Sequence, residues 1–154
     1  MKNFLWIAAI LLCFGREPAS AQNTALGERV SEIKSEAWLG SIRPAEAPTT
    51  VILFFSVSNP ACVTSLERLH ALVEKSDGRL RVIAVTRDDE TRVASVATPY
   101  LSERMAVAFD TDGKLHKNFG VNYVPFALLT DARNRVLWQG NSLQLNETIL
   151  STAR

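Results

Sequence analysis

Runs of consecutive apolar residues recur along the chain from residue 50 onward. Three of them lie at 50–55 (TVILFF), 80–86 (LRVIAVT) and 105–109 (MAVAF). Uninterrupted apolar runs of this length are typical of parallel strands that are buried on both faces, because both sets of alternating side chains then face a core. Two further runs, 126–130 (FALLT) and 135–139 (RVLWQ), flank the turn-forming residues 131–134, which predicts an antiparallel hairpin.

The segments between these runs have the pattern of helices. Cys62, Leu66 and Leu69 recur at helical spacing after Asn59-Pro60. An N-cap residue followed by proline at the first helical position predicts a helix over 60–75. Three more helices are expected. They run from Asp88 to about Pro99, from Asp110 to about Phe119 as a turn and a short helix, and over 142–152.

The predicted order of elements is β-α-β-α-β-α-β-β-α. Strands that alternate with helices and end in a hairpin predict an α/β fold, with a mixed central sheet, helices on both faces and a C-terminal β-hairpin followed by a helix. We assign this domain to residues 49–154. Residues 22–48 are an N-terminal extension that we expect to pack on the domain, and they open with polar, helix-compatible sequence (ALGERVSEIKSEAWLG).

Composition and charge restrict the function classes. The chain has 154 residues, of which 47% are hydrophobic and 21% charged, so a single packed domain is expected and intrinsic disorder is excluded. The 17 Lys and Arg residues balance 16 Asp and Glu residues, for a net charge of +1. This leaves no basic field that would hold nucleic acid. We expect a monomer.

The first 21 residues have the three parts of a secretory signal peptide. Lys2 is a positive n-region, 4–14 (FLWIAAILLCF) is a short apolar core, and Ala19-Ser20-Ala21 is a small-x-small cleavage site. The apolar run is shorter than the roughly 20 residues that cross a bilayer. We therefore expect a periplasmic or secreted protein with no membrane contact beyond the cleaved signal. A retained N-terminal anchor is the alternative.

Cleavage after Ala21 would leave Cys62 as the only thiol, because Cys13 leaves with the signal. A single cysteine cannot form an internal disulfide, so stability must come from the core. His70 and His116 are the only histidines, and neither stands at a metal-ligand spacing from another strong ligand. We expect both to be surface or half-buried residues, and we predict neither a metal site nor a cofactor.

Two segments carry the candidate chemistry. In the first, the buried strand 50–55 leads through a sharp loop to a helix with Cys62 in its first turn. The second is 120–125 (GVNYVP), which the hairpin follows directly. A proline just before a buried strand belongs at the first strand residue or in a tight turn, because it cannot donate to the ladder. Val124-Pro125 is therefore a candidate cis peptide bond.

The chain resembles the thioredoxin fold and, within it, the exported TlpA/ResA-like thiol–disulfide proteins, or redoxins. Beside the two segments above, the resemblance rests on an A-x-D-x-x-G-x-x-x-x-x-F-G-V-x-x-x-P run over 108–125, a W-L-G at 38–40 and a W-x-G at 138–140. It covers roughly residues 30–152. It implies a thioredoxin-like fold in which Pro125 is cis and lies opposite Cys62.

The resemblance breaks at the chemical centre. The family pattern is W-C-x-x-C, whereas residues 58–62 read SNPAC. Asn59 thus replaces the attacking cysteine, and only the second cysteine remains, as Cys62. Thiol–disulfide exchange needs a thiolate to attack and, in a dithiol cycle, a second thiol to release the mixed disulfide. Leu53 stands where many thioredoxins place a buried carboxylate, so we expect no proton acceptor from the strand.

Cys62 and Asn59 each have more than one interpretation. A helix N-terminus lowers the pKa of a thiol and burial raises it. Cys62 is therefore a small buried residue, a single thiol that forms mixed disulfides, or a peroxidatic cysteine, although Asn59 and Phe55 fit the peroxidatic pattern poorly. Asn59 either caps the helix, which is worth about 1 kcal/mol relative to Ala, or holds a ligand carbonyl or a water at the helix N-terminus.

Two functions remain open. The first is a thiol–disulfide oxidoreductase of the TlpA/redoxin lineage that keeps single-cysteine redox chemistry at Cys62, with a thiol or disulfide of a partner protein completing the cycle. The second is a redox-inactive binding or chaperone-like module, in which an extended peptide pairs with the backbone before Pro125 in a groove near Asn59. The reactivity of the Cys62 thiol separates the two functions.

Overall fold

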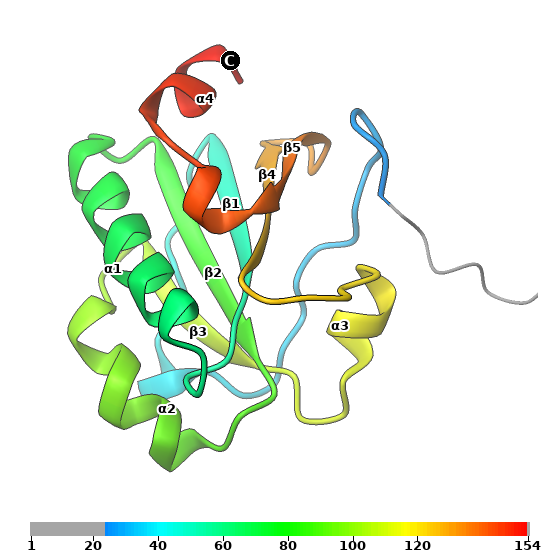
Figure 1. Ribbon diagram of the computed structural model, residues 1–154. Coiled ribbons are helices and arrows are strands. Elements are labelled where there is room, and N and C mark those ends of the chain that lie inside the picture. Colours follow the sequence, from blue (N-terminus) through cyan, green and yellow to red (C-terminus); the bar gives the residue numbers. More distant parts are fainter. Residues whose placement is uncertain (1–23, 154) are drawn as a thin grey trace, which may run out of the picture.

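The computed structural model describes residues 24–153 (Figure 1). The predicted signal peptide at 1–21 lies outside the described residues. Within the described part of the chain, no helix is long and apolar enough to cross a membrane.

A five-stranded mixed sheet forms the centre of the domain, with the strand order β3-β2-β1-β4-β5. The strands are β1 (Thr49–Phe54), β2 (Leu80–Thr86), β3 (Met105–Phe109), β4 (Phe126–Asp131) and β5 (Val136–Asn141). Strands β1, β2 and β3 are parallel, with Val51 opposite Val82, and β4 runs antiparallel to both β1 and β5. The predicted mixed sheet and its hairpin are confirmed.

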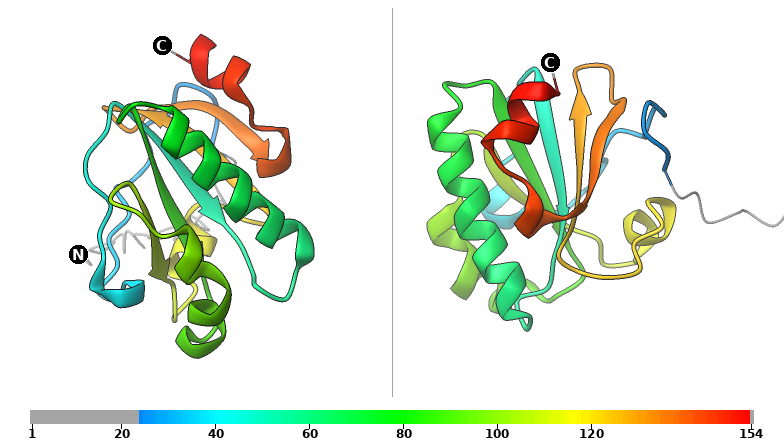
Figure 2. Two further views of the ribbon diagram at one scale, coloured as in Figure 1. Left: turned by 90° about the vertical axis from the view of Figure 1, so that its left-hand side faces the viewer. Right: turned by 45° about the horizontal axis from the view of Figure 1, so that its top comes forward.

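Helices lie on both faces of this sheet, as predicted. They are α1 (Pro60–Lys75), α2 (Glu90–Ala97), α3 (Lys114–Asn118) and α4 (Glu147–Thr152), with short 3-10 turns at Leu39–Ser41, Thr98–Tyr100 and Ser142–Gln144. Helices α1, α2 and α4 contribute side chains to one apolar cluster, and α3 contributes to the other. Figure 2 shows α1 and the N-terminal extension on opposite sides of the sheet.

The alternation of side chains along β1 explains why its sequence is apolar throughout. Val51 and Leu53 face the cluster under α1, whereas Ile52 and Phe54 face the cluster under α3. All four side chains are at most 4% exposed. Burying an aliphatic or aromatic side chain of this size stabilises the fold by roughly 1.5–3 kcal/mol, so both faces of the central strand hold the two layers together.

The N-terminal extension is extended and pairs with both edges of the sheet. Gly27 N–H donates to the Val136 carbonyl at 2.7 Å in β5, and Phe109 N–H in β3 donates to the Ala37 carbonyl at 3.0 Å. Between these contacts Ile33, 8% exposed, packs into the cluster under α3. Extended backbone thus covers part of each exposed strand edge, which would otherwise present unpaired backbone groups.

The helix-compatible sequence of the extension therefore forms no helix before Leu39. Pairing with the sheet edges satisfies its backbone groups instead, and this tertiary context outweighs a weak local preference. The last predicted helix is also divided. A 3-10 turn ends at Gln144, and α4 begins only after Asn146, whose side-chain oxygen accepts from Ile149 N–H at 3.0 Å.

Candidate functional site

Asn59 caps the N-terminus of α1, as its position before Pro60 predicts. Its Oδ1 accepts a hydrogen bond from Ala61 N–H at 3.0 Å, and its backbone is extended, with φ −105°. The Asn59 carbonyl accepts from Cys62 N–H at 2.9 Å. The side chain thus supplies an acceptor for one of the N–H groups that a helix leaves unpaired at its first turn.

The other half of the Asn59 amide reaches the second segment. Its Nδ2 donates to the Val124 carbonyl oxygen at 3.2 Å, across a sequence separation of 65 residues. The Val124–Pro125 peptide bond is cis, in agreement with the sequence-based prediction. One side chain therefore joins the start of α1 to the loop before β4. The sequence alone predicts the cap but not this second contact.

Cys62 is fully buried. Its exposed fraction is 0%, and it belongs to the apolar cluster that includes Leu53 and Phe55 of the β1 segment and Leu66 of α1. Burial raises the pKa of the Cys62 thiol above its ordinary value, and the nearby Asp88 carboxylate raises it further. A hydrogen bond from the Ser56 backbone lowers this pKa but does not outweigh burial. At neutral pH the thiol is therefore protonated and enclosed.

Asp88, which follows β2, places a carboxylate next to the loop between β1 and α1. Its Oδ2 accepts from Val57 N–H at 2.7 Å, and its own N–H donates to Thr86 Oγ1 at 3.1 Å. It thereby fixes the loop between β1 and α1. Leu53, which stands where many thioredoxins have a buried carboxylate, is an apolar core residue with 0% exposure. The sequence does hold a signal for the contact of Asp88 with Val57. Strands β1 and β2 are parallel and end at the same edge of the sheet, so the residues that follow them lie close together.

Polar groups and one aromatic ring are exposed around Asn59 and Pro125. The hydroxyl oxygens of Ser56 and Ser58 lie 2.8 Å apart, and Ser58 is exposed where the family pattern has tryptophan. Tyr123 is 50% exposed, and its ring stands edge-on against Phe126 with 5.4 Å between centroids.

The two histidines take no part in this site. His116 is only 7% exposed, which corrects the expectation that it is a surface or half-buried residue. Its Nδ1 lies 2.6 Å from Oδ2 of the buried Asp110, and its ring stands edge-on to Phe54. Burial lowers the pKa of His116, and Asp110 opposes this shift. The partner carboxylate is what allows a polar ring to be buried here.

The Asp110–His116 pair supports the loop that carries Val124. The His116 carbonyl accepts from Val121 N–H at 2.9 Å, and the Asp110 carboxylate also accepts the backbone N–H groups of Leu115 and His116. His70 lies elsewhere, with Nδ1 at 3.0 Å from the Tyr100 carbonyl. Within residues 24–153, no group of three His, Cys, Asp or Glu side chains is placed to hold a metal ion.

The chain matches no protein-family model and no curated protein sequence. Its architecture is similar to that of solved structures at low sequence identity. A thioredoxin-like protein from Aeropyrum pernix is 19% identical, with a TM-score of 0.60 over 75% of this chain and 79% of that one. The chain has a thioredoxin-like fold.

Two further neighbours with this fold are described as exported proteins. A secreted Mycobacterium tuberculosis disulfide oxidoreductase, homologous to Escherichia coli DsbE, is 16% identical with a TM-score of 0.56, over 69% of this chain and 79% of that one. The exposed lipoprotein thioredoxin Etrx1 of Streptococcus pneumoniae is 17% identical with a TM-score of 0.57, over 70% of this chain and 84% of that one. At these identities the likeness shows the fold alone.

Proposed function

We propose that this protein is an exported, redox-inactive thioredoxin-fold module of the TlpA/ResA type that binds extended peptide segments of other proteins. The observation that carries the proposal is the double contact of Asn59, which caps α1 through Ala61 N–H and donates to the Val124 carbonyl. At the position where the family pattern has the attacking cysteine, this chain has an amide that holds two segments together. An amide cannot take part in disulfide exchange.

The backbone before Pro125 has the features that peptide pairing requires. Val124 N–H makes no hydrogen bond within the described residues, and Val124 is half-buried rather than enclosed. Its carbonyl oxygen accepts from Asn59 and has a second lone pair. An extended peptide can therefore accept from Val124 N–H in the manner of an added strand.

Tyr123 supplies an anchor next to this backbone. The side chain is 50% exposed, and its edge-on contact with Phe126 holds the ring in place. Exposed aromatic side chains with restricted motion are the residues that most often dominate the binding energy of a peptide interface. The surface thus combines a main-chain donor with an apolar contact, and neither depends on a thiol.

Single-cysteine redox chemistry at Cys62 is the second function that the sequence leaves open. It requires a thiolate that a partner can reach. The complete burial of Cys62 and the upward shift of its pKa both oppose this requirement. The peptide-binding function does not need an accessible thiol, and for this reason we favour it.

Export is part of the proposal and rests on the signal-peptide pattern of residues 1–21. Two of the chain's structural neighbours, a secreted M. tuberculosis protein and an exposed S. pneumoniae lipoprotein, support this part of the proposal. We propose that the peptide segments bound by this chain belong to proteins of the same exported compartment.

A thiol-free unfolded polypeptide tests the proposal directly. The probe is a fluorescently labelled polypeptide whose cysteines have been carboxymethylated, and the measurement is fluorescence anisotropy. We expect saturable binding that Tyr123→Ala weakens about tenfold, the scale at which an interface anchor acts. Leu26→Ala is the matched control, because Leu26 is also a large exposed apolar residue, at 68%, outside the proposed surface.

Two results would count against peptide binding. The first is equal weakening by Tyr123→Ala and Leu26→Ala, which would mean non-specific contact with apolar surface. The second is binding only of polypeptides with disulfides, accompanied by covalent capture at Cys62 through thiol–disulfide exchange, which would favour the redox function instead. Either result would overturn the peptide-binding proposal.

A further inference from the structure

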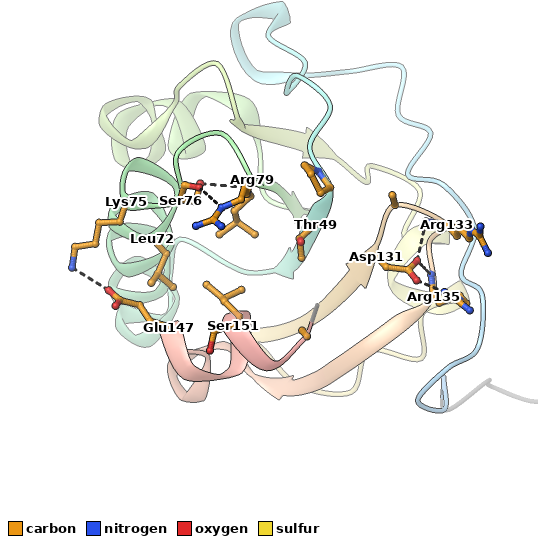
Figure 3. Close-up of a pocket in the computed structure, with 15 residues that line it drawn as sticks. Thr49, Leu72, Lys75, Ser76, Arg79, Asp131, Arg133, Arg135, Glu147 and Ser151 are labelled. Atoms are coloured by element: carbon orange, nitrogen blue, oxygen red, sulfur yellow. Dashed lines mark hydrogen bonds and ion pairs between the residues drawn. The ribbon is translucent and has the colours of Figure 1, made fainter.

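A large cavity lies at the end of the sheet remote from Asn59. Its volume is about 730 Å³, and it opens beside Thr49, where β1 begins. Its walls are the last turn of α1, helix α4 and the turn between β4 and β5 (Figure 3). Asn59 follows the other end of β1, so the cavity and the candidate peptide surface are separate.

Part of the cavity lining is apolar. This apolar wall is formed by Pro48, Leu72, Leu80, Ala132, Leu150 and Ala153. Leu72 and Leu150 pack against the core cluster but remain partly exposed. At the exposed rim, an ion pair joins α1 to α4, with Lys75 Nζ 3.3 Å from Glu147 Oε1. An apolar hollow of a few hundred Å³ with a polar rim is the usual form of a small-molecule site.

The charged side chains of the cavity carry an excess of positive charge. Four cations (Lys75, Arg79, Arg133, Arg135) and two anions (Asp131, Glu147) line it. Lys75 pairs with Glu147, and Arg135 pairs with Asp131 at 2.9 Å. Within residues 24–153, the guanidinium groups of Arg79 and Arg133 have no carboxylate within 4 Å.

Arg79 is the cation placed next to the apolar wall. Its Nε donates to the Ser76 carbonyl at 3.2 Å, which leaves the two terminal nitrogens without a partner in the described residues. Figure 3 shows Arg79 on the side of α1 near Leu72, whereas Arg133 lies with Arg135 at the hairpin turn. The side chain that can receive an anion beside the apolar wall is therefore Arg79.

We propose that this cavity binds a small organic anion with an apolar body, of the class of medium-chain carboxylates. The carboxylate pairs with the terminal nitrogens of Arg79, a geometry in which the guanidinium donates one N–H to each of the two oxygens. The alkyl chain lies against Leu72, Leu80 and Leu150. The volume lies within the range of roughly 300–1,000 Å³ that is typical of ligand sites. The binding is independent of the peptide surface proposed above.

Calorimetric titration with dodecanoate below its micellar concentration tests the proposal. We expect saturable binding with one site per chain. We expect weaker binding of dodecylammonium, which has the same apolar body and the opposite charge. The proposal would be overturned if dodecanoate showed no saturable binding. It would also be overturned if the two amphiphiles bound with equal affinity, because the cavity would then not select an anion.

Two variants locate the binding. Arg79→Gln should weaken dodecanoate binding about tenfold or more, the scale of a lost charged hydrogen bond, and should leave dodecanol binding unchanged. Arg92→Gln is the control, because it removes the same charge from exposed α2 surface outside the cavity. Leu150→Glu should abolish binding of both dodecanoate and dodecanol, because it places a charged side chain in the apolar wall.

Unchanged dodecanoate binding in Arg79→Gln would refute the assigned role of Arg79. Equal weakening of dodecanoate binding by Arg92→Gln would refute it too, because the loss would then follow from the net charge of the protein and not from a specific contact. If Leu150→Glu fails to fold, as circular dichroism would show, the comparison of Arg79→Gln with Arg92→Gln still tests the proposal. Failure of this binding would leave the peptide-binding proposal intact, because Tyr123 and Val124 do not line the cavity.

Discussion

Asn59 and Val124 are joined by a hydrogen bond of 3.2 Å from the Asn59 side-chain nitrogen to the Val124 carbonyl oxygen. The same amide accepts from Ala61 N–H through its oxygen. In a redox-active site of the family pattern this position would be a thiol with no such pair of contacts. The Asn59 side chain thus connects α1 to the loop before β4, and the contribution of this connection to stability can be measured.

Two substitutions at Asn59 separate its two contacts. Asn59→Ala removes both and should lower the free energy of unfolding by about 1–2 kcal/mol, the sum expected for a cap and a part-buried hydrogen bond. Asn59→Ser keeps a cap oxygen but is too short to reach Val124, so it should cost about half as much. Urea denaturation measures both values. If Asn59→Ser is as stable as the unmodified protein, the Val124 contact contributes nothing.

The burial of Cys62 predicts a slow thiol. At neutral pH, alkylation by iodoacetamide should be at least a hundredfold slower in the folded protein than in urea, because the thiol is enclosed and its pKa is raised. Mass spectrometry of samples quenched over time gives both rates. A folded-state rate equal to or above the unfolded rate would show an accessible thiolate and would restore single-cysteine redox chemistry as the leading function.

The uninterrupted apolar runs predict the sheet well, for a physical reason. The run 105–109 coincides with β3, and the run 80–86 coincides with β2. Each strand is covered on both faces, so hydrophobicity alone sets its limits. For the extension 22–48, the local sequence does not predict the observed backbone. Its sequence is helix-compatible, yet hydrogen bonds with Val136 and Phe109 keep residues 27–37 out of a helix. Partners so distant in the sequence leave no local signal.

The candidate site, too, is only partly predictable from the sequence. The Asn59 cap follows from its place before Pro60 and is predicted from the sequence, as is the cis bond before Pro125. The contact of Asn59 with Val124 and that of Asp88 with Val57 depend on how loops meet in space. Only the contact of Asp88 with Val57 has a signal in the sequence, because Asp88 follows a strand that is parallel to β1.

The buried His116 predicts a pH-dependent stability. Burial lowers the pKa of His116 below its unfolded value of about 6.5, so the unfolded chain binds a proton more readily than the folded one. The free energy of unfolding should therefore fall as the pH is lowered through about 6.5. His116→Asn keeps a donor to Asp110 and should lose this dependence. Urea denaturation between pH 8 and 5 measures it, and a flat wild-type curve would contradict the prediction.

Asn59→Cys tests the assignment of the whole site. The variant carries Cys-Pro-Ala-Cys at the start of α1, where backbone N–H groups lower the pKa of a thiol below its free value of about 8.5. We expect residues 59 and 62 to form an intramolecular disulfide under mild oxidant and the variant to gain insulin reductase activity that the unmodified protein lacks. The gain should be partial, because Leu53 supplies no proton acceptor and the new thiol replaces the contact with Val124.

The matched control for this experiment is Asn59→Ser, which makes the same local change without a thiol and should show no reductase activity. Reductase turnover by the unmodified protein would mean that Cys62 acts alone. A variant whose two thiols stay reduced under mild oxidant would mean that the start of α1 does not have the geometry of a thioredoxin site. The expected result requires both a silent wild type and a disulfide in Asn59→Cys, because the capped start of α1 and the cis bond before Pro125 are present while position 59 carries an amide.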